Sequence, residues 1–321
     1  MIITVTPNPA LDITHRLDTL RPHTSHRVAE VHEQAGGKGV NTARVLTALG
    51  RPATAVLPLG GPTGDLLRAD LARSGIRHRA VPLAHGSTRR TLTLVHDGDA
   101  TVLNEPGPRL DPADFGALRA AVAELLPGAR ALTLAGSLPP GLPGHAYRSL
   151  TELAAAHRVP VVLDTSGKAL LAALPAGPAV VKPNAAELAE TTGLDDPLAA
   201  ARTLAGDTGT AVVASLGADG LLAVTPQGSW RARLSRPLPA AGPAGRNPTG
   251  AGDSAVAALA AGLADGTPWP ELLADAVALS AATVLTRHAG AFDPQAHREL
   301  RPAVVVTRLP EPSRPRTAPC P

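Results

Sequence analysis

The chain has 321 residues, of which 44% are hydrophobic, 2% are aromatic and 18% are charged, and its formal net charge is +3. The length suffices for one large α/β domain or two small ones, whereas the scarcity of aromatic side chains argues against a protein that stacks on single-stranded nucleic acid. A single cysteine, Cys320 in the C-terminal segment, excludes a disulfide framework and a thiolate metal site.

The first third of the chain predicts strands that alternate with helices, interrupted by a small accessory sheet. The N-terminus has no basic segment, so no signal peptide is expected, and no apolar run predicts a membrane span; a cytoplasmic location is expected. Hydrophobic spacing and glycine stops predict a strand at 2–6, accessory strands within about 10–35, a helix at 39–50, a strand at 53–61, a helix at 63–75 and a hairpin at 91–103.

The remaining two thirds continue the alternation of strands and helices. They predict helices at about 112–126, 145–157, from 185 and at about 197–206, a short helix between 166 and 179, and two long helices across 251–286. They also predict strands at 131–136, 159–166, 179–184 and 210–217 and a hairpin in 220–234. Such alternation predicts an α/β fold with a mostly parallel sheet covered on both faces. We expect one domain over residues 1–308, with the accessory sheet from about 10–35 and 88–105, and a disordered tail at 309–321.

Polar residues follow several of the predicted strands. In a parallel α/β sheet, ligands bind beyond the carboxyl ends of the strands, so these residues are expected to converge. They are Asn8 and Asp12 after the first strand, Ser137 in "GSLPPG", Lys182, Asn184 and Glu187 after "AVV", and Ser215, Gly217 and Gly220 in "SLGADG". The chain has only three lysines and five asparagines, and two of the lysines, Lys38 and Lys182, lie in such turns.

The segment "RNPTGAGDSAVAALAAGL", residues 246–263, turns a glycine loop into an Ala-rich helix that starts near 251–253. The first turn of a helix has unpaired N–H groups and a partial positive charge, and it binds phosphate well. Asp253 then has two interpretations. It caps the helix, or it takes a proton from an acceptor while the neighbouring amides hold a phosphoryl group.

Other apparent motifs carry less weight. "GAGDSA" matches a loose dinucleotide pattern, but no hydrophobic strand leads into it, and "AGGKG" lacks the spacing of a P-loop. The histidines offer no close metal-binding pair, and His23, His26 and His32 are expected on the surface.

Six segments in order resemble the ribokinase-like (PfkB) carbohydrate kinases. They are "AGGKGVNTARVLTALG", "AGSLPPGLP", "DTSGKAL", "VVKPNAAEL", "ASLGADG" and "NPTGAGDS". "TPNPALD", "NEPGP" and the lysine of "GGKG" are most similar to the 1-phosphofructokinase and tagatose-6-phosphate kinase branch. The resemblance covers about residues 1–306 and implies a ribokinase-like three-layer fold in which the small sheet is a lid that closes over the sugar.

The resemblance implies roles at the phosphoryl-transfer end of the site. Asp253 would be the catalytic base, with Gly250, Ala251 and Gly252 as the anion hole. Asn184 and Glu187 match an N-x-x-E motif that organises Mg²⁺, often through water, although a plain helix start explains the same spacing. Lys182 would face the phosphates of ATP, and Ser215, Gly217 and Gly220 would border the nucleotide.

The resemblance also implies a sugar end. Asp12 would accept hydrogen bonds from sugar hydroxyls, while Gly37, Lys38 and Asn41 would line the sugar. Arg89 would bind the phosphate already on the substrate, and Arg27 and Ser137 are further candidates for that contact. Two residues depart from the family pattern. Thr91 stands where an asparagine is common, with Arg90 beside it as a second possible phosphate contact, and Pro248 replaces a usual Thr or Ser.

Together these features predict an ATP- and Mg²⁺-dependent phosphotransferase with an alcohol acceptor, which converts fructose 1-phosphate to fructose 1,6-bisphosphate. Kinases of tagatose 6-phosphate or fructose 6-phosphate remain alternatives, as do a non-catalytic sugar-phosphate-binding regulator and a nucleotide-dependent oxidoreductase. The expected partners are a sugar phosphate and ATP, without nucleic acid or membrane. Because the lids of relatives can pair between subunits, a homodimer is expected.

Overall fold

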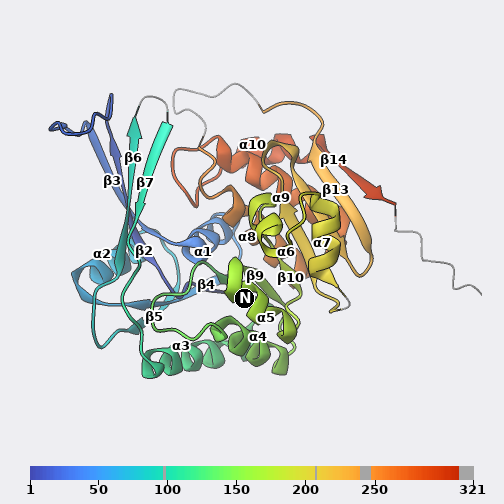
Figure 1. The fold of residues 1–321 in the computed structure, drawn as a ribbon, viewed down its shortest axis with the longest axis horizontal. Helices are drawn as coiled ribbons and strands as arrows, with labels where there is room; N and C mark the ends of the chain where they lie inside the picture. Colours follow the sequence, from blue (N-terminus) through green and yellow to red (C-terminus); the bar gives the residue numbers. More distant parts are fainter. Residues whose placement is uncertain (97–98, 207, 239–246, 311–321) are drawn as a thin grey trace, which may run out of the picture.

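A computed structural model of the chain describes residues 1–96, 99–206, 208–238 and 247–310. Within these ranges one large sheet lies between two layers of helices, and a smaller sheet stands to one side (Figure 1). This arrangement is the three-layer α/β fold that the alternation of elements predicts.

The large sheet has ten strands among the described residues, and the strands from β11 across to β5 run parallel, while β12 to β14 add antiparallel at the other edge. In spatial order they are β14 (Val304–Leu309), β13 (Gly228–Leu234), β12 (Leu221–Thr225), β11 (Ala211–Ser215), β10 (Val180–Val181), β9 (Val161–Asp164), β8 (Ala131–Ala135), β1 (Ile2–Val5), β4 (Ala53–Leu59) and β5 (His78–Pro82). The carboxyl ends of β1, β8, β9, β10 and β11 therefore share one edge.

Successive residues of the parallel strands pack into different hydrophobic clusters. Ile2 belongs to the cluster on one face and Ile3 to the cluster on the other, which is why these strands are apolar on both sides. The first cluster includes α1 (Lys38–Ala48), α8 (Ala251–Asp265), α9 (Trp269–Val284) and α10 (Pro294–Leu300); the second includes α3 (Pro112–Leu125), α4 (Ala146–Ala156), α5 (Gly167–Ala173), α6 (Ala185–Thr192) and α7 (Pro197–Ala205); α2 (Gly61–Arg73) packs with α1 against β4 in a third. Single 3₁₀ turns cover Leu126–Gly128, Leu174–Ala176, Gly217–Asp219 and Arg301–Ala303.

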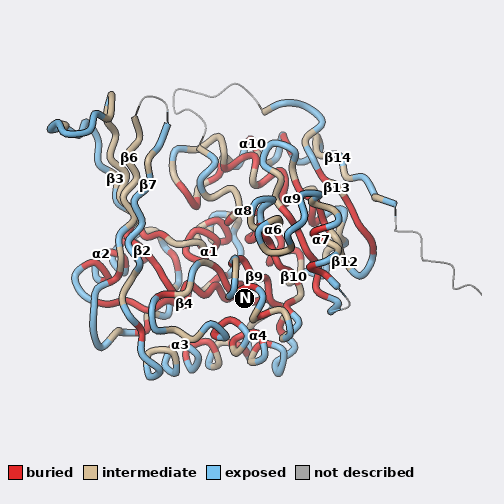
Figure 2. The backbone as a smooth tube through the Cα atoms, in the orientation of Figure 1, coloured by how far each residue is buried: buried red, intermediate tan, exposed pale blue. Residues whose placement is uncertain are grey.

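The small sheet has four described strands in the order β3 (Glu30–Gly36), β2 (Ala10–Arg16), β6 (Arg89–His96) and β7 (Asp99–Asn104). It projects from the body, and most of its backbone is exposed or only half-buried (Figure 2). Its register places Asp12 between Gln34 and Thr91, and because residues directly opposite one another in a sheet point to the same side, these three share one face. We call this the inner face, since Gln34 Nε2 donates a hydrogen bond to the Ala289 carbonyl of the body.

The expected elements are confirmed, and three further ones were not predicted. These are β5, α10 and β14, which lie at an edge of the sheet or at the end of the described chain. Strand β14 runs to Leu309, so the predicted domain end at 308 falls one residue before the strand ends. Residues 311–321 of the predicted tail and residues 97–98 of the predicted hairpin lie outside the described residues. Within the described part, no helix is long and apolar enough to cross a membrane.

Candidate functional site

Asp253 lies in the first turn of α8, yet it does not cap the helix. The N-cap is Gly250, in a left-handed conformation with φ 87°, and no side chain caps this end. A Cβ atom at Gly250 would lie 3.0 Å from the backbone nitrogen of Gly290, so both conformation and space require glycine. The Asp253 side chain is only 7% exposed, and its Oδ2 accepts a hydrogen bond of 2.8 Å from Asn41 Nδ2. The capping interpretation of Asp253 is therefore excluded.

Burial is the main cause that raises the pKa of Asp253 to about 7, and the negative charge of Asp164 adds to it. The hydrogen bond from Asn41 and the charges of Lys38 and Lys182 act in the opposite direction. A carboxylate with a pKa near the working pH can accept a proton in a reaction and release it afterwards. The site thus holds a group suited to general base chemistry.

Two ammonium groups gather beside the start of α8. Lys38 opens α1, Lys182 follows β10, and their Nζ atoms lie 3.2 Å and 3.4 Å from the same oxygen, Oδ1 of Asp164. The side chain of Lys182 is 5% exposed and that of Lys38 is 40% exposed. The Lys182 ammonium group also lies 3.4 Å from the position that a Cβ atom would take at Gly252.

Burial alone would lower the pKa of Lys38, but the carboxylates of Asp164, Glu187 and Asp253 outweigh it, and the net direction is upward. Lys38 is therefore charged at neutral pH. Two positive side chains next to a helix N-terminus form a binding site for an anion such as phosphate. Of the amides at this end, that of Ala251 donates a hydrogen bond of 3.1 Å to the Pro248 carbonyl. Base and anion site lie side by side.

Within the inner face of the small sheet, Asp12 and Arg89 are the residues nearest to this anion site. A Cβ atom at Gly36 would overlap the carboxylate of Asp12, so only glycine lets Asp12 lie against the turn that leads to Gly37 and Lys38. Burial raises the pKa of Asp12 to about 6, although Arg89, Thr91 and Arg44 lower it. A half-buried carboxylate beside a guanidinium suits a ligand that carries both hydroxyl groups and a negative charge.

The guanidinium of Arg89 is held by the carbonyl groups of Asn8 and Glu105 and by the hydroxyl of Thr91. Thr91 pairs with Asn104 of β7, and its hydroxyl donates to Asn104 Oδ1 at 3.3 Å, so an amide lies next to Thr91. Arg90 pairs with the buried Leu11 on the opposite face. The structure therefore does not bring Arg90 to this side, contrary to our expectation.

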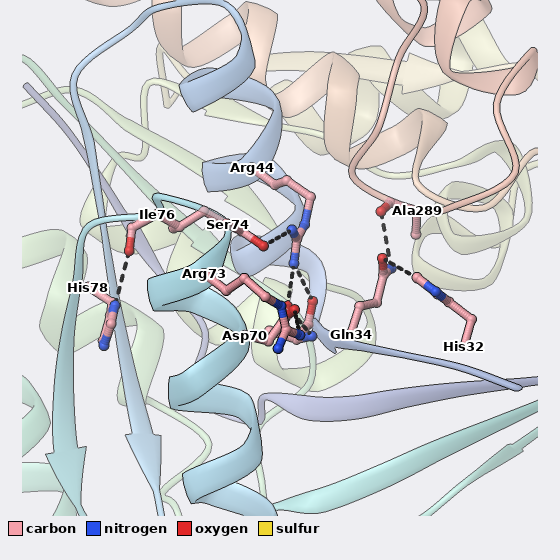
Figure 3. A network of polar contacts seen from close by, with 10 residues as sticks. His32, Gln34, Arg44, Asp70, Arg73, Ser74, Ile76, His78 and Ala289 are labelled. Atoms are coloured by element: carbon pink, nitrogen blue, oxygen red, sulfur yellow. Dashed lines mark hydrogen bonds and ion pairs between the residues drawn. The ribbon is translucent and has the colours of Figure 1, made fainter.

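A polar network holds the small sheet onto the body (Figure 3). Asp70 Oδ2 accepts a 2.8 Å hydrogen bond from the Ala35 amide, and Arg44 donates to both the Ala35 carbonyl and Asp70. Gln34, the residue before Ala35, donates a hydrogen bond to the Ala289 carbonyl. The rings of His32 and His288 stack with their centroids 3.9 Å apart. His32, expected to be a surface residue, is half-buried. These contacts fix the glycine turn that carries Lys38.

A hollow of about 530 Å³ opens next to this centre. Asn184 and Ser215, which form a single parallel bridge, line it together with Gly217. The full lining is Asn184, Ala185, Ala186, Pro197, Ser215, Leu216, Gly217, Asp219 and Arg231. Gly220 is not in the lining, but its amide donates to the Gly217 carbonyl and closes the turn that shapes it.

Asn184 and Glu187 form a capping box at the start of α6. Asn184 Oδ1 accepts from the Glu187 amide, and Glu187 Oε2 accepts from the Asn184 amide, both at 2.8 Å. The helix-start interpretation of this motif is thus realised in the structure, whatever further role the pair has. In the described part of the chain, no group of three or more His, Cys, Asp or Glu side chains could hold a metal ion directly.

The sequence profile described as "pfkB family carbohydrate kinase" matches residues 7–296. The chain belongs to the PfkB family of carbohydrate kinases. Solved structures agree with this membership. Phosphofructokinase-2 from Escherichia coli, in complex with potassium, is 30% identical, with 94% of this chain and 98% of that chain covered and a TM-score of 0.86.

Two more distant structures share the fold of this PfkB kinase. A possible 1-phosphofructokinase from Thermotoga maritima has a TM-score of 0.85 at 24% identity and covers 97% of this chain and 100% of its own. Ribokinase from Arabidopsis thaliana, in complex with ribose and ATP, has a TM-score of 0.72 at 21% identity, with coverages of 94% and 98%. The ribokinase-like fold predicted from the sequence is confirmed.

Two predicted site residues of this PfkB kinase, Ser137 and Arg27, are exposed to solvent. Ser137 is exposed after β8, and its hydroxyl accepts a hydrogen bond of 3.1 Å from Asn8 Nδ2. Arg27 is exposed and precedes β3, whose first residue pairs with Arg16 at the end of the small sheet away from Asp12. The structure does not bring Arg27 into the group around Lys38 and Asp253.

Asp164 was not among the predicted site residues. It is the last residue of β9, its side chain is 1% exposed, and it contacts both site lysines. The signal was available, because Asp164 begins the "DTSGKAL" segment directly after a buried apolar run, as Lys182 follows its own strand. The contact of Gly290 with Gly250 and Asn41 could not be found this way, since it joins segments with no shared pattern.

Proposed function

We propose that this PfkB kinase transfers the γ-phosphoryl group of ATP to the free primary hydroxyl of fructose 1-phosphate and gives fructose 1,6-bisphosphate. The observation that carries the proposal is the buried Asp253, held by Asn41 rather than used as a cap, beside two lysines and the N-terminus of α8. Phosphoryl transfer depends mainly on positioning and on neutralising charge, so this set of groups is sufficient.

Asp253 would accept the proton of the sugar hydroxyl while the oxygen of that hydroxyl forms a bond to the γ-phosphorus of ATP. The bond between that phosphorus and the oxygen bridging to the β-phosphate breaks, and the electron pair leaves with ADP. The amides of Gly250 and Gly252 would donate hydrogen bonds to the transferring group, and the amide of Ala251 would join them by exchanging its bond to the Pro248 carbonyl for one to the phosphate. Lys182 lies against Gly252 and would neutralise charge on the same phosphates.

At the sugar end, Asp12 would accept hydrogen bonds from hydroxyl groups, while Gly37, Lys38 and Asn41 line the sugar. Arg89 would bind the resident phosphate with its planar fork of donors. Support comes from the shared inner face of the small sheet and from the position of the Asp12 carboxylate against Gly36, in the turn that leads to Lys38. We retain Ser137 and Arg27 as further candidates for the phosphate contact, with the smallest support for Arg27, which is remote.

The hollow beside Asn184 would hold the nucleotide, bordered by Ser215 and Gly217 and shaped by Gly220. The capping box uses Oδ1 of Asn184 and Oε2 of Glu187, so the second oxygen of Glu187 lies outside it. Since Mg²⁺ keeps several waters and takes few protein oxygens, Asn184 and Glu187 fit a water-mediated site. When bound there, Mg²⁺ would neutralise charge on the phosphates.

A second candidate is a kinase of fructose 6-phosphate or tagatose 6-phosphate. It is favoured by the 30% identity to phosphofructokinase-2 from Escherichia coli, one structure of which is in complex with fructose-6-phosphate. A non-catalytic regulator is disfavoured, because it would not need both a base with a raised pKa and the glycines next to it.

The substrate is tested by measuring ADP release with a coupled assay, using fructose 1-phosphate, fructose 6-phosphate and tagatose 6-phosphate in parallel. We expect the highest kcat/KM with fructose 1-phosphate. A higher value for another sugar phosphate would move the proposal to the second candidate, and ADP release that no sugar stimulates would reject kinase function.

We further infer that the protein works in the cytoplasm as a homodimer. Support for association comes from the outer face of the small sheet, where the apolar side chains of Val31 and Leu103 are 55% and 53% exposed. Both lie on the face opposite Asp12, so a second copy could cover them without closing the site.

A further inference from the structure

Asp164 is a buried charged group that the proposed chemistry does not use. Its side chain is 1% exposed, and its Oδ1 lies within 3.4 Å of both Lys38 and Lys182. Burying a carboxylate is costly unless opposite charges compensate it, and here two ammonium groups do so. Two of the three lysines in the chain therefore pair with the same carboxylate. We asked what function this arrangement has.

Asp253 is a second carboxylate with which the same two lysines could pair. Both interact electrostatically with Asp253, and after burial, which is the largest cause, these lysines together with Asp164 and Asn41 shift the pKa of Asp253. Within the described residues neither lysine forms an ion pair with Asp253, which instead accepts its hydrogen bond from Asn41. In a buried site, an ammonium group without a fixed partner would be drawn strongly to the remaining carboxylate. Such a pair would occupy the oxygens that have to take the proton.

We propose that Asp164 is a positioning residue that fixes the Lys38 and Lys182 ammonium groups beside the start of α8 and keeps them from pairing with Asp253. The inference rests on the proposed kinase function. Asp164 ends β9, next to β10, from which Lys182 follows, and the Lys182 amide donates to the Leu163 carbonyl, so the sheet itself sets this spacing. The two lysines and one carboxylate leave one net positive charge for a phosphate.

Asp164→Asn tests the inference without any substrate. With lysine labelled at ¹³Cε, the three signals can be followed against pH, and that of Lys38 is assigned by its loss in Lys38→Met. We expect the Lys38 signal of the wild type to show a step near pH 7, where the neighbouring Asp253 ionises. In Asp164→Asn the step should move to lower pH, because Asp253 loses a nearby negative charge and gains a lysine partner. A step that stays in place overturns the inference.

Kinetics give the second readout. Asp164→Asn should lower kcat at pH 8 by about 10²-fold, as expected for displaced phosphate contacts, and should move the acid limb of the kcat profile to lower pH. A loss of kcat with an unmoved limb would indicate a merely structural role. A raised Mg²⁺ requirement with an unmoved limb would indicate a metal role. Either result overturns the inference.

Asp275→Asn is the matched control, since Asp275 also lies between two basic side chains, His297 and Arg301, but on α9 outside the site. It should move neither the step nor the limb. If Asp164→Asn does not fold, the smaller neutral Asp164→Ser replaces it in both measurements. Because the ¹³C step needs no turnover, it decides the inference even where the sugar assay has rejected the kinase.

Discussion

Replacing Asp253 with asparagine is expected to lower kcat by about 10²–10⁴-fold, the usual contribution of a general base. The amide keeps the size of the side chain and its contact with Asn41 but cannot take the proton. Binding of ATP and sugar phosphate should change little, because the anion-binding groups are other residues. Steady-state kinetics and calorimetric titration of each substrate measure the two effects separately.

The pH dependence follows from the same residue. The pKa of Asp253 is raised to about 7, so its carboxyl becomes protonated and inactive as the pH falls through that value, and wild-type kcat should fall with it.

Asp265→Asn is the matched control for Asp253→Asn. Asp265 lies at the other end of α8 and pairs with Arg51 and Arg130, so its substitution should leave kcat unchanged. Turnover by Asp253→Asn equal to that of the wild type would defeat the mechanism.

Replacing Arg89 with methionine is expected to reduce kcat/KM for the sugar phosphate by about 10–100-fold, because a hydrogen bond to a charged group contributes about 1.5–3 kcal/mol. The loss should appear mainly in KM for the sugar phosphate, with KM for ATP unchanged. Methionine preserves most of the side-chain volume, so the small sheet keeps its packing. Initial rates over a grid of both substrates give these constants.

Arg90→Met is the matched control for Arg89→Met. The two arginines are adjacent on β6, but Arg90 lies on the opposite face, next to Leu11. It should therefore leave KM for the sugar phosphate unchanged. Equal effects of the two substitutions would mean that the general positive charge of the small sheet matters, and that Arg89 does not bind the phosphate directly.

The sequence predicts the layers of this fold because apolar runs and amphipathic helices alternate regularly along most of the chain. It does not predict β5 or β14, for different physical reasons. β5 is an edge strand in which His78 is half-buried and Arg79 is exposed, so it lacks the apolar run of a buried strand. β14 is an edge strand with alternating exposure, and it pairs with β13 far back along the sequence.

The candidate site could be predicted only as a set of separate turns. The strand-end rule explains why Lys182 and Ser215 lie at the same edge of the sheet, but it does not say which side chain each one contacts. Asp164 is the clearest example, since its burial between Lys38 and Lys182 depends on the strands β9 and β10 and on the helix α1. Asn184 is the opposite case, because its local pattern predicts a capping box and the structure has one.

A crystal structure with a non-hydrolysable ATP analogue, Mg²⁺ and fructose 1-phosphate tests the central claim most directly. We expect the terminal phosphate of the analogue at the amides of Gly250 to Gly252, and the free primary hydroxyl of the sugar within hydrogen-bond distance of the Asp253 carboxylate. A sugar hydroxyl directed away from Asp253, or phosphates bound at another edge of the sheet, would contradict the account.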